Sequence, residues 1–76
     1  MDFKEFEEAV GKLDSNKYHI GRMVGFSKEG KLVIQKWEIF RKDMTEKEYY
    51  DEKNLAILSS EKGNTIEDIK KLVKGE

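Results

Sequence analysis

Residues 17–41, KYHIGRMVGFSKEGKLVIQKWEIFR, decide the fold, because they contain two runs rich in β-branched and aromatic side chains. Residues 17–27 and residues 31–41 each have the length and composition of a β-strand. The connection SKEGK, residues 27–31, suits a three-residue loop in which a type I turn is followed by a glycine in the left-handed conformation. The stretch therefore predicts a β-hairpin.

Two strand registers are compatible with this hairpin. The three-residue loop places Val24 opposite Ile34 and Arg22 opposite Lys36, whereas a two-residue Glu-Gly loop places Arg22 opposite Trp37. Like charges directly opposite each other destabilise a sheet, which counts against the first register at Arg22. A shift of one residue turns the side chains of one strand to the other face of the sheet, so the choice of register also decides which face is buried.

In the first register one face of the hairpin is apolar at both ends, and we expect it to be the core face. Its apolar members are Tyr18, Ile20, Val24, Phe26, Leu32, Ile34 and Phe40. The opposite face would then be open to solvent, with Met23, Trp37 and Ile39 on it. Gly21 and Gly25 also fall on this face and would leave a shallow floor, over which Trp37 can lie.

An amphipathic helix is predicted on each side of the hairpin. In residues 2–13 an apolar stripe recurs at helical spacing, and Asp2 can cap the helix N-terminus. The members of this stripe are Phe3, Phe6, Val10 and Leu13. A second helix begins after Thr65, with Asp68 at the third position of a capping box and Gly75 at the end. Its inward-facing residues are Ile66, Ile69, Leu72 and Val73.

The region between the hairpin and the last helix is less uniform. Residues 55–59, LAILS, form a short apolar run that predicts a third strand. Residues 43–54 leave two alternatives, a short helix around 45–53 behind the capping box of Thr45 and Glu48, or a polar loop. The prediction for residues 1–76 is one α+β domain. A three-stranded antiparallel sheet would carry the N- and C-terminal helices on one face.

Charge is distributed unevenly along the chain, although the net charge is only −1. Residues 17–42 hold seven basic and two acidic side chains, whereas residues 1–16 hold two basic and five acidic ones, and residues 43–76 six basic and nine acidic ones. A basic segment between acidic flanks is a hint about binding partners.

The sequence contains few of the residues that catalysis or metal binding requires. The chain has no cysteine and a single histidine, His19, so no thiolate, histidine pair or His/Cys ligand cluster can form. Adjacent carboxylates such as Glu7-Glu8 diverge on a helix, and residues 43–52 have the charge density but not the spacing of a calcium loop. We therefore expect a protein that is not an enzyme and uses no cofactor or metal. Ser59 and Ser60 are expected to be strand-end serines.

The absence of cysteine and of any apolar run of about 20 residues predicts a cytoplasmic domain that does not associate with membranes. Within it, the hairpin is the segment whose composition favours binding. Trp, Tyr and Arg contribute interface energy most often. We expect a non-catalytic protein-interaction or regulatory module that captures a protein partner, or a second copy of itself, through the open sheet face or by strand addition. The candidate binding residues are Arg22, Met23, Lys36, Trp37, Ile39 and Arg41.

Single-stranded nucleic acid is the alternative ligand. The hairpin interleaves lysines and arginines with Tyr18, His19, Phe26, Trp37 and Phe40, and sheet-based binders stack bases on exposed aromatic rings while basic side chains contact phosphates. The net charge is far less basic than is usual for such domains.

Overall fold

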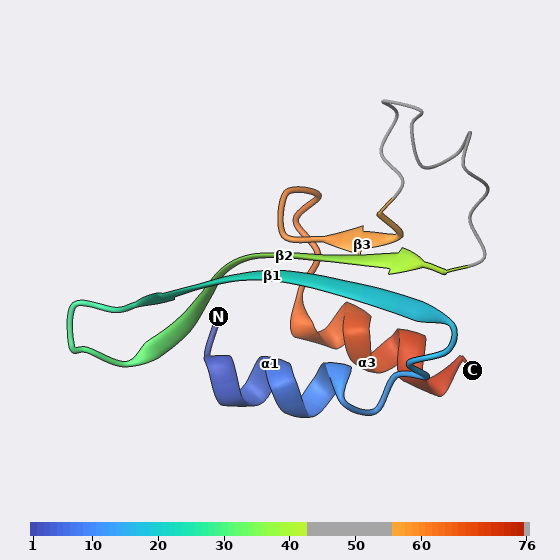
Figure 1. Cartoon of the computed structure of the whole chain (residues 1–76), viewed down its shortest axis with the longest axis horizontal. Coiled ribbons are helices and arrows are strands. Elements are labelled where there is room, and N and C mark those ends of the chain that lie inside the picture. Colours follow the sequence, from blue (N-terminus) through green and yellow to red (C-terminus); the bar gives the residue numbers. More distant parts are fainter. Residues whose placement is uncertain (43–55, 76) are drawn as a thin grey trace.

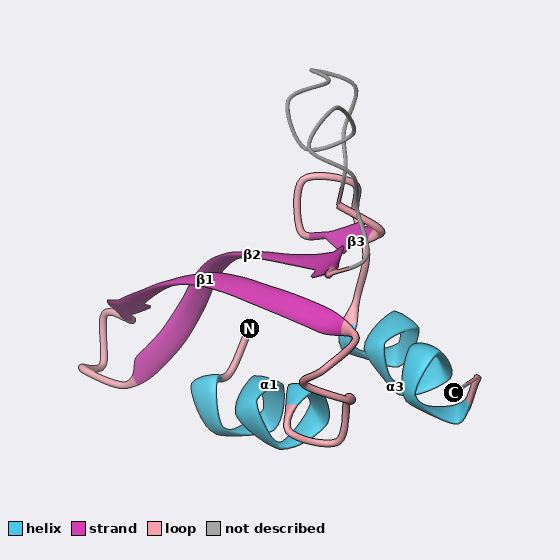
Figure 2. Ribbon diagram, turned by 45° about the vertical axis from the view of Figure 1, so that its right-hand side comes forward, coloured by secondary structure: helices cyan, strands magenta, loops and turns pink. Residues whose placement is uncertain are grey.

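The computed structural model describes residues 1–42 and 56–75. In chain order the elements are α1 (Phe3–Val10), β1 (Tyr18–Phe26), β2 (Leu32–Arg41), β3 (Leu58–Ser59) and α3 (Ile66–Lys74). The three strands form an antiparallel sheet in the order β1-β2-β3, and both helices lie on the same side of it (Figures 1 and 2). The predicted α+β fold is therefore confirmed, whereas the short helix proposed around residues 45–53 lies outside the described residues.

The helix termini follow the local sequence. Asp2 caps α1, since its carboxylate accepts a hydrogen bond from the backbone N–H of Glu5 at 2.9 Å. The helix ends at Val10, three residues before the predicted end, because the chain turns at Gly11. At α3 the backbone N–H of Thr65 donates to the Asp68 carboxylate at 2.8 Å. That hydrogen bond, with a second from the Asn64 side chain, lowers the pKa of Asp68 from its ordinary 3.8.

The hairpin uses both expected registers, one on each side of a β-bulge. Near the turn Val24 pairs with Ile34, as the three-residue loop predicts, but beyond Met23 the pairing shifts and Arg22 lies opposite Trp37. The extra residue is Gln35 on β2, which has no partner on β1. The shift removes the contact between like charges at Arg22 that the first register would have required.

The bulge changes which side chains of β2 are buried. Ile34 faces the helices. After the extra residue, the alternation of side chains along β2 shifts by one position, so Trp37 and Ile39 also face the helices. Trp37 is only 2% exposed and Ile39 is fully buried, so the prediction that they lie on the open face was wrong. Trp37 does not cover Gly21 either, because nothing lies within 4 Å of where a Cβ of that residue would be. The side chain of Gln35 lies over Gly25 instead.

The core lies between the helices and β2. Its buried residues come from α1 and the turn after it, from β2 and from α3; they are Phe6, Ala9, Val10, Leu13, Ile34, Trp37, Ile39 and Ile69. The Phe6 and Trp37 rings contact each other with centroids 5.7 Å apart in a tilted arrangement.

The hairpin is longer than the helix that covers it. Nine residues of β1 span about 30 Å at about 3.3 Å per residue, whereas the eight residues of α1 span about 12 Å at 1.5 Å per residue. The loop end of the hairpin consequently extends past the N-terminus of α1 (Figure 1). Val24, Phe26 and Leu32, which were expected in the core, are exposed there, and Phe26 is 71% exposed.

The third strand is shorter than predicted. Of its described residues, 56–59, only Leu58 and Ser59 pair with β2, opposite Ile39 and Glu38, although Ile57 also donates its backbone N–H to the Ile39 carbonyl at 2.9 Å. The strand ends where the chain turns at residues 60–63 toward α3, with Gly63 in the left-handed conformation.

Candidate functional site

The outer edge of β2, on the side away from β1, is covered by two segments of the chain, the N-terminus and residues 57–60. The N-terminus covers this edge at Ile34. The backbone N–H of Ile34 donates to the Met1 carbonyl at 2.7 Å, and the Met1 ammonium group donates to the Ile34 carbonyl at 3.3 Å. Asp2 forms an isolated β-bridge with Val33 at the same place.

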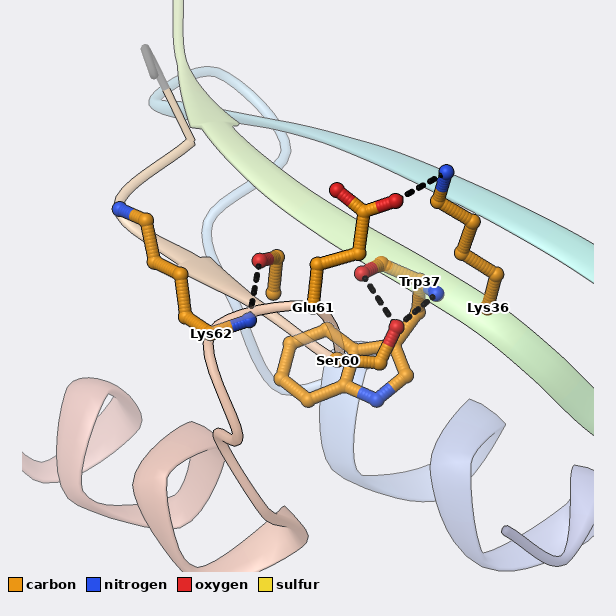
Figure 3. A network of polar contacts seen from close by, with 6 residues as sticks. Lys36, Trp37, Ser60, Glu61 and Lys62 are labelled. Atoms are coloured by element: carbon orange, nitrogen blue, oxygen red, sulfur yellow. Dashed lines mark hydrogen bonds and ion pairs between the residues drawn. The ribbon is translucent and has the colours of Figure 1, made fainter. Parts of the chain in front are cut away.

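Ser60 covers the middle of the β2 edge. Its hydroxyl accepts a hydrogen bond from the Trp37 backbone N–H at 3.1 Å and lies 3.4 Å from the Trp37 carbonyl oxygen (Figure 3). Its own backbone N–H donates to the same carbonyl at 3.0 Å. A serine side chain therefore takes the place of a neighbouring strand. Ile57 and β3 continue the cover at Ile39.

The loop that supplies Ser60 is held by its own polar contacts. The hydroxyl of the buried Ser59 accepts one hydrogen bond from the Lys62 backbone N–H at 3.2 Å, and the Ser59 N–H donates to the Asn64 side-chain oxygen at 2.9 Å. Lys36 on β2 forms an ion pair with Glu61 at 2.5 Å (Figure 3). The hydrogen bond and the charge of Glu61 raise the pKa of Lys36 above its ordinary 10.5. Ser59 and Ser60 thus have structural contacts in this loop.

The outer edge of β1 is different. Hydrogen bonds from Ser27 to Lys31 and from Lys42 to Lys17, both 2.8 Å long, close the two ends of the β1–β2 ladder. Hydrogen-bonded and non-hydrogen-bonded pairs alternate along an antiparallel ladder. Counting inward from either end places the even-numbered residues of β1 in non-hydrogen-bonded pairs, so that their N–H and C=O groups point away from β2.

We call these outward groups the β1 edge; they belong to Tyr18, Ile20, Arg22, Val24 and Phe26. The same count on β2 selects Leu32, Ile34, Trp37, Ile39 and Arg41. The middle three are the residues whose backbone groups bind Met1, Ser60 and Ile57. On the β1 edge no residue of 1–42 or 56–75 forms a further strand, since β1 is terminal in the sheet order β1-β2-β3.

Large apolar side chains are exposed beside the distal half of the β1 edge. Met23 is 57% exposed on the face away from the helices, and Val24 and Phe26 are exposed on the other face. Leu32 lies opposite Phe26, and Met1 is exposed next to Ile34. These are all the exposed large apolar side chains of the described chain, and four of the five lie on β1 and β2 between residues 23 and 32.

The candidate binding residues predicted from the sequence are divided between the two faces of the sheet. Arg22 turns toward the helices, where its Nε lies 2.7 Å from the Glu7 carboxylate and its guanidinium carbon 5.6 Å from the Phe6 ring centroid. Trp37 and Ile39 are in the core, so neither presents a contact surface. Only Met23 and Lys36 lie opposite each other on the open face, and Arg41 is exposed at the end of β2.

A shallow hollow of about 250 Å³ lies over Gly21 and is bordered by Arg22, Met23, Lys36 and Trp37. The open face continues toward the other end of the hairpin, where His19 lies opposite Phe40, next to Arg41 and Lys42. Within residues 1–42 and 56–75 no three acidic or histidine side chains gather in a way that would hold a metal ion. No helix of this part of the chain has the length and apolar character needed to span a bilayer.

Val24 and Phe26 are the residues of the site that the sequence reasoning missed, because it placed them in the core. The signal that would have found them is the difference in length between the predicted helix of residues 2–13 and the predicted strands. Twelve helical residues span about 18 Å, which leaves much of a strand of about 36 Å uncovered.

Comparison with models of protein families, with curated proteins and with solved structures found no match to this chain.

Proposed function

We propose that this chain is a non-catalytic protein-interaction module that binds an extended peptide segment by strand addition along the β1 edge. In strand addition, main-chain hydrogen bonds provide affinity and the alternate side chains beside the edge provide selectivity. The observation that supports the proposal is the contrast between the two edges. Two segments cover the β2 edge, residues 1–2 and 57–60, whereas the β1 edge has no partner strand among the described residues.

The exposed side chains suit the same mode of binding. Met23 lies on one face of the edge and Val24 and Phe26 on the other, so an added strand would contact apolar surface on both faces. Aromatic and methionine side chains are enriched in protein interfaces. The lack of cysteine supports a cytoplasmic location for this module.

The test is selection of random nine-residue peptides against the whole protein, followed by measurement of amide chemical-shift changes by NMR. We expect the selected peptides to shift the amide signals of Arg22, Val24 and Phe26 more than those of Val33 and Gln35. Peptides that instead shift signals on α1 and α3, or an absence of binding peptides, would contradict strand addition at this edge.

A matched pair of variants separates backbone from side-chain binding. Val24→Pro removes one outward N–H donor, which an edge strand tolerates, whereas Val24→Ala removes side-chain atoms and keeps the donor. A lost hydrogen bond corresponds to roughly tenfold in affinity. We therefore expect Val24→Pro to weaken peptide binding about tenfold more than Val24→Ala does. Equal affinities would show that the edge backbone is not used.

Nucleic-acid binding is supported by a narrower set of residues than the sequence suggested. Trp37 is buried, and Arg22 and Lys36 form ion pairs with Glu7 and Glu61. What favours this second proposal is the pair of His19 and Phe40 on the open face beside Arg41 and Lys42. Fluorescence anisotropy with labelled single strands at ~50 mM salt tests it, because phosphate contacts are strongest at low salt. An anisotropy that stays unchanged up to about 100 µM protein would rule it out.

A further inference from the structure

The composition of β1 is unusual for an exposed edge strand. Natural edge strands are commonly protected from pairing by lysine, proline or a bulge on the edge itself. Residues 18–26 contain no lysine and no proline, and the bulge of this hairpin lies on β2 at Gln35. The β1 edge therefore lacks the devices that prevent a second strand from pairing with it.

The single arginine of β1 does not provide such protection. Arg22 is bound to Glu7 of its own chain at 2.7 Å and lies over the Phe6 ring. Its charge is thus compensated on the helix side of the sheet, and two copies of β1 can approach each other without an unpaired charge at the centre.

Sheet topology favours a second copy over an unrelated strand. If two β1 edges pair around a two-fold axis, three strands from each copy form one sheet that ends at β3 on both sides. Each β3 has only two residues, so the combined sheet has short outer edges. A single foreign strand would instead present a new long edge of its own.

The direction of the backbone groups restricts the register. Outward groups belong to even-numbered residues, so a two-fold pair must join even residues to even residues. A register centred on Arg22 would place the two arginines directly opposite each other, which destabilises a sheet. Centring the axis on Met23 places Arg22 opposite Val24 of the second copy and Ile20 opposite Phe26 of the second copy. This arrangement also covers Met23, Val24 and Phe26, the exposed apolar side chains of β1.

We infer that the partner of the β1 edge is the β1 edge of a second copy of this chain, paired antiparallel around a two-fold axis at Met23. The inference rests on the proposed function, strand addition at this edge, and identifies the occupant. The result is a homodimer with one continuous antiparallel sheet and the helices of both copies on the same side of that sheet.

The chain has no cysteine, so single cysteines report the geometry cleanly. Directly opposite residues of a sheet have Cα atoms about 4.5–5.5 Å apart, within the range of a disulfide. We expect Met23→Cys to form a covalent dimer with added diamide at about 50 µM protein. His19→Cys is the matched control, because residue 19 is exposed on the same face but lies about 26 Å from its counterpart, eight residues at about 3.3 Å each. We expect this control to cross-link at least tenfold more slowly.

Sedimentation equilibrium of the unmodified chain between about 10 µM and 1 mM measures the dimer directly. Val24→Pro removes one outward donor from each copy, so we expect the dissociation constant to rise about a hundredfold, against less than tenfold for Val24→Ala. A monomer throughout this range overturns the inference. Equal cross-linking of the two cysteine variants, or a dimer that Val24→Pro leaves intact, also overturns it, because the contact would then lie elsewhere.

Sedimentation equilibrium and the peptide-binding measurement together separate this inference from the proposed function. A monomeric chain that still binds selected peptides at Arg22, Val24 and Phe26 would retain strand addition as the function and exclude the second copy as the partner. A monomeric chain that binds no peptide at this edge would exclude both.

Discussion

The two outer edges of the β1–β2 hairpin have similar backbones and different surroundings. Along β2, three backbone positions meet the N-terminus, Ser60 and Ile57, whereas along the β1 edge the described residues supply no partner strand. Both strands are rich in β-branched and aromatic residues, so strand propensity does not distinguish them. The contact that each edge receives from distant segments decides whether it is structural or available for binding.

The largest expected effect is on the free energy of unfolding. It appears when Trp37, behind the covered β2 edge, is compared with Phe26, beside the open β1 edge. Trp37→Ala should lower the free energy of unfolding by about 3–5 kcal/mol, because it leaves a cavity against Phe6. Phe26→Ala should change it by less than about 0.5 kcal/mol, since Phe26 is exposed. Urea unfolding of dilute protein measures both. Equal losses would show that the distal hairpin is packed against something.

Amide hydrogen exchange compares the edges directly. The N–H groups of Ile34 and Trp37 are bonded to Met1 and Ser60, whereas those of Arg22 and Val24 point outward from β1. In dilute protein we expect exchange at the first pair to be at least about a hundredfold slower, because exchange there requires local opening. Protection of Val24 that persists at high dilution would show that the β1 edge is covered within one chain.

Ser60→Ala removes the hydroxyl that binds the Trp37 N–H on the β2 edge and keeps the backbone hydrogen bond from residue 60 to the Trp37 carbonyl. The half-buried N–H of Trp37 would lose its acceptor, and an unsatisfied donor costs about 1–3 kcal/mol. We expect a loss of unfolding free energy near the low end of that range in thermal denaturation. Ser15→Ala, at an exposed serine in the turn after α1, is the control and should be close to neutral. A neutral Ser60→Ala would mean that water replaces the hydroxyl and that this part of the edge is accessible.

The smallest expected effect concerns Asp68, which binds Thr65 and Asn64 behind the loop that carries Ser60. Because the pKa of Asp68 is lowered in the folded state, its contribution to stability is complete above about pH 5 and decreases as the pH falls through 3.8 and below. Wild-type protein should therefore melt at a higher temperature than Asp68→Asn near neutral pH, and the difference should shrink as the pH falls below 3.8. Glu67→Gln, at the exposed neighbour, should show a smaller difference at neutral pH. A difference between wild type and Asp68→Asn that does not change with pH would contradict the assignment.

Local patterns in the sequence were sufficient for most of the fold. The caps at Asp2 and Thr65, the turn with Gly30 in the left-handed conformation and the helix faces all follow from short-range chemistry. The hairpin register did not follow in the same way, because each simple register is correct for only part of the ladder, the first for three pairs and the second for six. The repulsion expected between Arg22 and Lys36 was the one sign in the sequence that the first register could not continue along the whole hairpin.

The candidate site could be predicted less well, because it depends on contacts between residues far apart in the chain. Ser60 lies 23 residues from Trp37, and Met1 lies 33 residues from Ile34. No pattern around a serine after an apolar run indicates that its hydroxyl will replace a strand. The exposure of Phe26 could have been predicted from the sequence, because the predicted strands are longer than the predicted helix of residues 2–13.

Gln35 acts on the hairpin as a frameshift acts on a coding sequence. Before Gln35, the side chains of β2 that face the helices are at even-numbered positions, such as Ile34. After Gln35 they are at odd-numbered positions, such as Trp37 and Ile39. Deleting this single residue would leave every pair of the ladder in place, so that Ile34, Trp37 and Ile39 would face the helices from one regular strand without a bulge. The fold should therefore tolerate substitution and also deletion at position 35, since Gln35 is exposed, has no partner on β1 and contributes nothing to the core.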